Sequence, residues 1–287
     1  MSFLDRINAC NRYDLSGLVP FKADRQIIGW MKSSFSKRLT EYPSVFIVEE
    51  DGVCFAPEHA TADLRSAVLA EIVPDWAAEG LIHKLREEIY PVRLAWSSPD
   101  YFRLDRALVP LFGVRSYSVH VNGFIRRADD LHLWIGRRSA SCTVEPGKLD
   151  NIVAGGQPAA LSIMDNLVKE CAEEANMSAD LALRAQSAGT VSYCFESDTG
   201  LKLDTLFCYD LEVPDDFLPM NQDGEIDDFS LMLLKEALAL IEEGNSFKFN
   251  VSLVIIDFAV RHGVLTPDNE PDYKAILAGL HAPAPAR

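Results

Sequence analysis

The chain has 287 residues, 48% of them hydrophobic and 24% charged, which is the balance of a soluble protein with one large domain or two ordinary ones. Its formal net charge of −16 disfavours binding to nucleic acids and to anionic membranes. It contains no apolar run long enough to cross a membrane, and its N-terminus lacks the apolar core of a secretory signal. We therefore expect a cytoplasmic protein whose partners include neither nucleic acid nor membrane.

The six cysteines do not indicate disulfides. No two of them form a CxxC pair, and a chain of this size does not need covalent cross-links. We expect reduced, mostly buried thiols, as in cytosolic proteins.

The first part of the chain, roughly residues 1–113, is predicted to be a small α+β domain. Short apolar runs between turns indicate strands, with an Asp-Gly hairpin turn after the third, at residues 18–21, 26–30 and 44–48. Apolar residues at three- and four-residue spacing predict helices at residues 33–39, 61–72, 76–88 and 105–112.

The second part, roughly residues 114–287, mixes strands with helices. Strands are predicted at residues 116–125, 131–136, 151–154, 188–195 and 201–211. Helices are predicted at residues 162–175, 227–243 and 251–262. This order favours an α/β/α sandwich with a mixed sheet. Because no proline- or glycine-rich linker separates the two parts, we expect them to pack closely.

Three glutamates share one face of the helix predicted at residues 162–175. Glu170, Glu173 and Glu174 follow the spacing i, i+3, i+4, and each like-charge pair costs an isolated helix roughly 0.2–0.5 kcal/mol. A solvated acidic face tolerates that cost. A hard divalent cation such as Mg²⁺, or Mn²⁺ in its place, would remove it, since such cations prefer oxygen ligands from carboxylates and phosphates.

A short strand ending in Gly155 and Gly156 precedes this helix. Glycine lets the backbone approach a ligand closely, so both residues are candidates for substrate binding. The segment is not a P-loop, because no Gly-Lys-Ser/Thr stands at the start of the helix.

Together these features resemble the Nudix box. Gly155 lies the expected distance before the stretch Lys169-Glu170-Cys171-Ala172-Glu173-Glu174-Ala175-Asn176-Met177. Leu161 replaces the first glutamate of that box, Lys169 replaces its arginine, and Asn176 replaces its last glycine. Lysine keeps the charge but loses the planar fork, whereas asparagine tolerates a left-handed helix cap.

Other segments resemble one branch of this family, fused to thiamine pyrophosphokinase in some fungi and found alone in plants and bacteria. They are His120–Phe124, Leu133–Ser139, Pro146–Asn151, Val153–Gln157, Tyr209–Pro214, Asn221–Glu225 and Ile256–Gly263, and in the preceding domain Val19–Phe21 and Ile28–Trp30. The resemblance implies a Nudix sandwich and metal-dependent cleavage of a diphosphate linkage that releases phosphate or a monophosphate. The implied substrates are thiamine diphosphate and its oxidised, damaged analogues.

The resemblance also implies roles for the acidic residues. Glu173 and Glu174 are the first-choice metal ligands, and Glu170 is either a ligand or the base that orients water. Glu225, in the turn after Asp223, is a second candidate base or ligand, and the alternative is a simple turn carboxylate.

The sequence leaves the roles of several basic and aromatic residues near the box open. Arg137 and Arg138 end a strand that should border the site, so they and Lys148 are candidates to hold the diphosphate or else plain surface residues. His120 and Trp134 are expected in the core, with metal binding and stacking on a heterocycle as the respective alternatives.

Three alternative functions stay compatible with the sequence. The substrate is alternatively a nucleoside diphosphate derivative, or the protein is a non-catalytic sensor, for which Leu161 is the best argument. An isomerase of isopentenyl diphosphate type would need an activated cysteine beside a metal, whereas Cys171 is expected to be buried. Either a monomer or a homodimer is compatible with the sequence.

Overall fold

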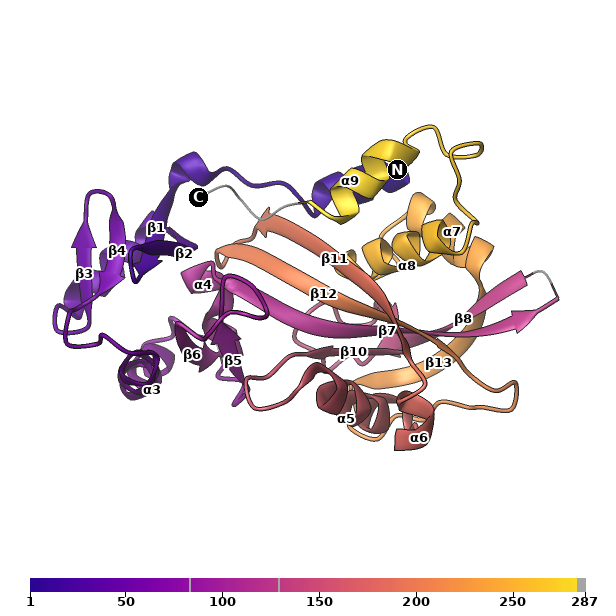
Figure 1. Cartoon of the computed structure of the whole chain (residues 1–287), viewed down its shortest axis with the longest axis horizontal. Helices are drawn as coiled ribbons and strands as arrows, with labels where there is room; N and C mark the ends of the chain where they lie inside the picture. Colours follow the sequence, from indigo (N-terminus) through magenta and orange to yellow (C-terminus); the bar gives the residue numbers. More distant parts are fainter. Residues whose placement is uncertain (83, 129, 283–287) are drawn as a thin grey trace.

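A computed structural model describes residues 1–82, 84–128 and 130–282 and shows a central mixed sheet (Figure 1). Five strands follow the order β11-β12-β7-β8-β13, while β10 pairs with β7 and β9 pairs with β8. Only β7 and β12 run parallel; the other described pairs of this sheet are antiparallel. The strands are β7 (Arg115–Arg127), β8 (Asp130–Arg138), β9 (Leu149–Asn151), β10 (Val153–Gly156), β11 (Gln186–Glu196), β12 (Leu201–Glu212) and β13 (Ile226–Leu233).

Helices cover both faces of this sheet, which gives the predicted α/β/α sandwich (Figure 1). The α5 face carries α5 (Ile163–Ala175) and α6 (Ala179–Ala182). The α8 face carries α7 (Leu234–Glu243), α8 (Phe249–Arg261), α9 (Tyr273–Leu280) and α1 (Phe3–Ala9). Successive residues of a strand point to opposite faces, so Ile125 packs in the core of the α5 face and Phe124 in that of the α8 face.

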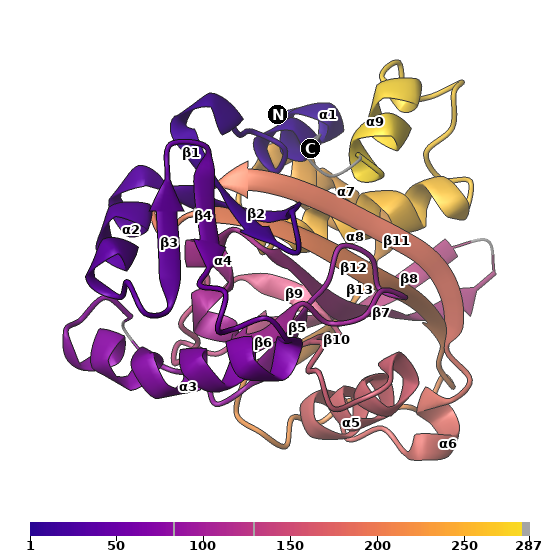
Figure 2. The same ribbon diagram turned by 60° about the vertical axis from the view of Figure 1, so that its left-hand side comes forward.

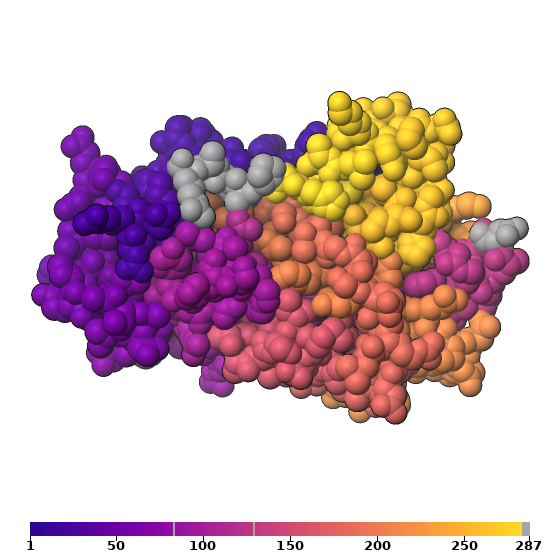
Figure 3. Space-filling model, viewed as in Figure 1, coloured from indigo at the N-terminus to yellow at the C-terminus, as the bar shows by residue number. Residues whose placement is uncertain are grey.

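The N-terminal region builds a second core at one end of the molecule (Figure 3). A four-stranded sheet of order β2-β1-β4-β3, a two-stranded sheet β5-β6 and three helices surround the buried rings of Phe21, Trp76, Phe102 and Phe112. The strands are β1 (Leu18–Ala23), β2 (Gln26–Lys32), β3 (Phe46–Glu49), β4 (Gly52–Phe55), β5 (Ile89–Val92) and β6 (Phe102–Asp105). The helices are α2 (Ser33–Arg38), α3 (Ala62–Ala78) and α4 (Val109–Phe112), with 3-10 turns at Leu15–Gly17, Leu39–Glu41 and Arg106–Leu108.

The first helix does not join that N-terminal core. Phe3 and Ile7 of α1 are buried in the core of the α8 face, beside α8 and α9. The expected division into residues 1–113 and 114–287 stays a prediction. Helix α1 belongs to the first of these ranges but packs against helices of the second. Within the described residues, no helix is long and apolar enough to span a membrane.

Two helix predictions were wrong. Residues 227–243 contain strand β13 followed by α7, not one helix. The apolar residues Phe229, Met232 and Leu233 match a helical spacing, but the segment pairs instead with the open edge of β8. Similarly, α3 runs through Pro74 and ends at Ala78, whereas helices at 61–72 and 76–88 were expected; His83 lies outside the described residues.

Candidate active site

Helix α5 is fixed to the edge strand β10 near both of its ends. Near its start, the side chain of Asn166 donates to the backbone carbonyl of Gly156 at 2.8 Å. Near its end, the carboxylate of Glu174 accepts from the backbone N–H of Ala154 at 2.8 Å. Asn176 ends the helix at φ 52°, the left-handed cap that asparagine tolerates, as predicted.

The two glycines of β10 make room for side chains. A Cβ atom at Gly155 would collide with the side chain of Glu170, and one at Gly156 would collide with the hydroxyl of Tyr90. Gly155 therefore lets the acidic face of α5 lie directly on the strand. Tyr90 comes from β5 in the N-terminal region, and no local pattern in the sequence connects it with this site.

The three glutamates of α5 fall into two classes. Glu170 and Glu174 are buried, with 9% and 5% of their surface exposed, whereas the side chain of Glu173 is 47% exposed. Burial raises the pKa of both buried carboxyls, and the charge of Glu170 raises that of Glu174 further. Lys169 donates to Glu173 at 2.6 Å and to Glu170 at 3.2 Å, so its ammonium lies at the exposed edge of the group.

This arrangement could hold a divalent cation, with two buried carboxylates as its ligands. Glu170 and Glu174 place buried carboxylate oxygens against β10. There the negative charge of Glu170 disfavours ionisation of Glu174. Mg²⁺ is commonly held by one or two carboxylates together with water and substrate phosphates. In the described part of the chain no three His, Cys, Asp or Glu side chains converge as a complete site, so substrate oxygens or a movement of Glu173 would have to complete it.

Glu225 and Arg138 lie on the α5 face with these carboxylates. The charge of Glu225 is among those that raise the pKa of Glu174, after burial and Glu170. Its side chain is exposed, in the bend before β13, and its role as a base stays a prediction. Arg138 is already engaged: it donates to buried Asp150 at 2.8 Å and to the carbonyl of Val144 at 3.0 Å.

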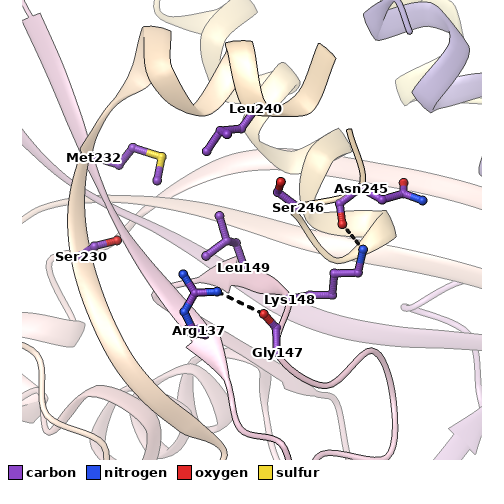
Figure 4. A pocket seen from close by; sticks show the side chains of 9 residues that line it. All are labelled: Arg137, Gly147, Lys148, Leu149, Ser230, Met232, Leu240, Asn245 and Ser246. Atoms are coloured by element: carbon purple, nitrogen blue, oxygen red, sulfur yellow. Dashed lines mark hydrogen bonds between the residues drawn. The ribbon is translucent and has the colours of Figure 1, made fainter. Parts of the chain in front are cut away.

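Arg137 and Lys148 are not brought to the glutamates. Because Arg137 precedes Arg138 on one strand, it points to the α8 face, opposite Leu149 on β9. It lines a pocket of about 400 Å³ together with Lys148, Leu149 and Leu240 (Figure 4). There Arg137 donates to the carbonyl of Gly147 at 3.3 Å, and Lys148 donates to the carbonyl of Asn245.

The remaining candidates are packed in the interior. His120 is buried and its Nδ1 lies 2.9 Å from Oδ1 of Asn151, while Trp134 packs in the core of the α5 face. Cys171 is fully buried on the same side, and burial raises the pKa of its thiol to about 12. None of the six cysteines is paired in a disulfide and four of them are buried, so the expectation of mostly buried cysteines is confirmed.

A family model described as a domain of unknown function (DUF4743) matches residues 2–116. The Nudix domain of Shewanella oneidensis NrtR, solved with ADP-ribose, is 15% identical with a TM-score of 0.42 over 52% of this chain and 90% of that one. That similarity is too weak to bear on the substrate.

Two plant proteins are much closer in sequence. Nudix hydrolase 20, chloroplastic, of Arabidopsis thaliana is 40% identical over 280 residues, which cover 93% of this chain and 74% of the relative. Nudix hydrolase 24, chloroplastic, of the same plant is 39% identical over 94% of this chain and 75% of the relative. With that identity over more than nine-tenths of its length, the chain belongs to the Nudix hydrolase family.

Proposed function

We propose that the protein hydrolyses the diphosphate linkage of thiamine diphosphate, or of its oxidised and damaged analogues, in the presence of Mg²⁺ or Mn²⁺. The observation that carries the proposal is the pair of buried glutamates, Glu170 and Glu174, held against the glycine strand β10. Two buried carboxyls without a matching buried cation are costly unless a ligand compensates them. The substrate class follows from the segments that resemble the thiamine pyrophosphokinase-linked branch.

The acidic residues of the chain would take different roles in this reaction. Glu170 and Glu174 would hold the metal, with Glu173 joining them from the exposed edge of α5. When bound, the cation would neutralise diphosphate oxygens and lower the pKa of a water. Glu225, whose exposed carboxylate acts electrostatically on Glu174, is the candidate to accept a proton from the attacking water.

A substrate screen tests the proposal. Thiamine diphosphate, its oxidised forms, ADP-ribose, nucleotide sugars and oxidised nucleotides would each be incubated with the protein and Mg²⁺, with products followed by phosphorus NMR. We expect the thiamine compounds to give monophosphate fastest. Faster release from a nucleoside diphosphate derivative would reassign the substrate while keeping the reaction.

A non-catalytic sensor remains the second candidate because of one residue. Leu161 stands where the Nudix box has its first glutamate, in the loop before α5. A sensor would bind one of the screened diphosphates without turnover, with or without Mg²⁺. Equilibrium binding alongside the screen separates the two functions.

A further inference from the structure

The N-terminal region touches the glycine strand of the active site through β5 (Figure 2). The backbone N–H of Ala159, three residues after Gly156, donates to the carbonyl of Ile89 at 2.8 Å. The hydroxyl of Tyr90 occupies the space that a side chain at Gly156 would need. Because a backbone hydrogen bond and a close packing contact occur together, β5 has a fixed position beside the active site.

A charged pair stands on this part of the N-terminal region. The guanidinium of Arg106 donates to the carboxylate of Glu88 at 2.9 Å and lies over the ring of Tyr90, 5.6 Å from its centroid. The backbone N–H of Arg106 also donates to the carbonyl of Glu88 at 2.9 Å. Arg106 is therefore held by a carboxylate, an aromatic ring and its own backbone at once.

The backbone that presents this pair is itself constrained. The carboxylate of Asp105 accepts from the backbone N–H groups of Arg86 at 3.1 Å, Glu87 at 2.8 Å and Ala107 at 2.8 Å. Glu87 has φ 58°, in the left-handed region that a glutamate rarely adopts. The three hydrogen bonds to Asp105 fix this backbone, and the strained conformation of Glu87 marks a segment whose shape matters for its neighbours.

Glu88 and Arg106 lie within electrostatic reach of the acidic group. A Cβ atom at Gly156 would lie 3.1 Å from Oε1 of Glu88. Burial, and after it the charges of Glu173 and Glu88, act to raise the pKa of Glu170. Glu88 in the N-terminal region and Glu225 before β13 both act electrostatically on Arg106, so this guanidinium faces carboxylates from both parts of the chain.

Arg106 also has room for a ligand. Its side chain is 51% exposed although it makes these contacts, whereas Arg138 is buried on Asp150 and Arg137 lies on the opposite face of the sheet. An anionic diphosphate approaching a group of carboxylates needs a cation at its side, and the planar guanidinium suits two phosphate oxygens. The net charge of −16 makes such a local cation more necessary.

We infer that Arg106, positioned by Glu88 and Tyr90, binds the diphosphate of the substrate, so that the N-terminal region completes the active site. The inference rests on the proposed diphosphate chemistry of the same site. Arg106 is a substrate-binding residue in this arrangement, and Glu88 is a positioning residue that acts through it.

The test compares Arg106→Ala and Arg106→Lys with the wild type. Binding of methylenediphosphonate, a diphosphate that cannot be hydrolysed at its bridge, would be measured by calorimetry with Mg²⁺, and kcat and KM would be measured on thiamine diphosphate. For Arg106→Ala we expect Kd and KM to rise about 10- to 100-fold, with a smaller fall in kcat. Arg106→Lys keeps the charge without the planar fork, so its Kd and KM should lie between those of Arg106→Ala and the wild type. It replaces Arg106→Ala in the test if that variant does not fold.

The matched control is Arg103→Ala on β6. Arg103 is also an arginine with a half-exposed side chain and an ion pair, with Asp100 at 2.8 Å, and we expect binding within twofold of wild type. Glu88→Gln should raise KM severalfold in the wild-type background and have no further effect in Arg106→Ala, because it acts only through the guanidinium.

The two proposals fail in different ways. If the wild type hydrolyses no diphosphate, the proposed function fails, and the calorimetric comparison still decides the role of Arg106. If Arg106→Ala and Arg106→Lys bind methylenediphosphonate as tightly as Arg103→Ala, or if the wild type does not bind it, the assignment of Arg106 is overturned.

Discussion

Both faces of the central sheet bury acidic side chains, and the compared groups differ in whether a cationic side chain neutralises them. On the α8 face, buried Asp257 and partly buried Asp210 share Arg261, which donates to Asp257 at 2.7 Å and to Asp210 at 3.0 Å. Asp210 also lies 2.9 Å from the ring of His262. Although burial acts to raise it, hydrogen bonds from His262 and Arg261 lower the pKa of Asp210 to about 2.

On the α5 face Asp150 is paired with Arg138 in the same manner, but the two buried glutamates of α5 have no such buried partner among the described residues. Glu174 accepts one backbone hydrogen bond, and Lys169 reaches Glu170 only from the exposed edge of the helix. Burial and neighbouring carboxylates raise the pKa of both buried glutamates. The comparison teaches that paired buried charges hold the fold together, whereas unpaired ones of a single sign indicate chemistry.

The largest effect should come from removing the charge of Glu174. Glu174→Gln keeps an acceptor for the N–H of Ala154 but loses a metal ligand, so turnover should fall about a thousandfold while the fold is kept. Initial rates of diphosphate cleavage, with circular dichroism for folding, check this. Glu242→Gln, on an exposed part of α7, is the neutral control. Normal turnover in Glu174→Gln would remove the contrast between the faces.

On the α8 face the same kind of change should affect stability instead. Asp210→Ala leaves His262 and part of the Arg261 guanidinium without their partner, which should lower the free energy of unfolding by about 4 kcal/mol. Urea unfolding measures it, and turnover per folded molecule should stay the same. Asp130→Ala removes an exposed ion pair with Lys235 and should cost less than about 0.5 kcal/mol. Equal losses in the two variants would mean that the buried network contributes nothing.

This network extends to buried His120 and supplies a pH dependence: Asn122 donates to Asp210 at 3.0 Å and accepts from Asn151, which contacts His120. Burial, with the charge of Lys248 second, lowers the pKa of His120 from 6.5 to about 4. The unfolded chain thus takes up this proton at a higher pH than the folded protein, so the contribution is present above pH 6.5 and lost as the pH falls toward 4. Between pH 7 and 4.5 the wild type should lose about 2.5 kcal/mol more stability than His120→Gln. Parallel losses in both proteins would show that His120 titrates normally.

The sequence was sufficient where the signal is local. Gly155, Glu170 and Glu174 lie within one strand–loop–helix segment, so the resemblance of that segment to the Nudix box indicated them together, and Asn176 was expected at the cap of the same helix. It was insufficient for residues 227–243, since alternating and helical spacings overlap there and the edge of β8 decides between them.

Residues that meet across the chain gave no such signal. Arg137 and Arg138 were treated as one pair, although neighbours on a strand point to opposite faces. Tyr90 and Arg106 reach β10 only because the N-terminal region packs there, and their sequence separation from Gly156 leaves no periodicity to find. Only the fold shows that β5 of the N-terminal region packs beside β10.

The smallest effect is expected at Cys171, which lies on the α5 face without taking part in its chemistry. Its thiol is fully buried beside Leu167 and Ala175, and burial raises its pKa to about 12, so it stays protonated and unreactive. Cys171→Ser places a hydroxyl in this apolar core and should cost about 1–2 kcal/mol of stability, with turnover within twofold of wild type. Cys54→Ser, at a less buried position on β4, should change neither. Loss of turnover in folded Cys171→Ser would point to a cysteine-dependent reaction such as an isomerisation, and the uncompensated glutamates would then serve a different chemistry from hydrolysis.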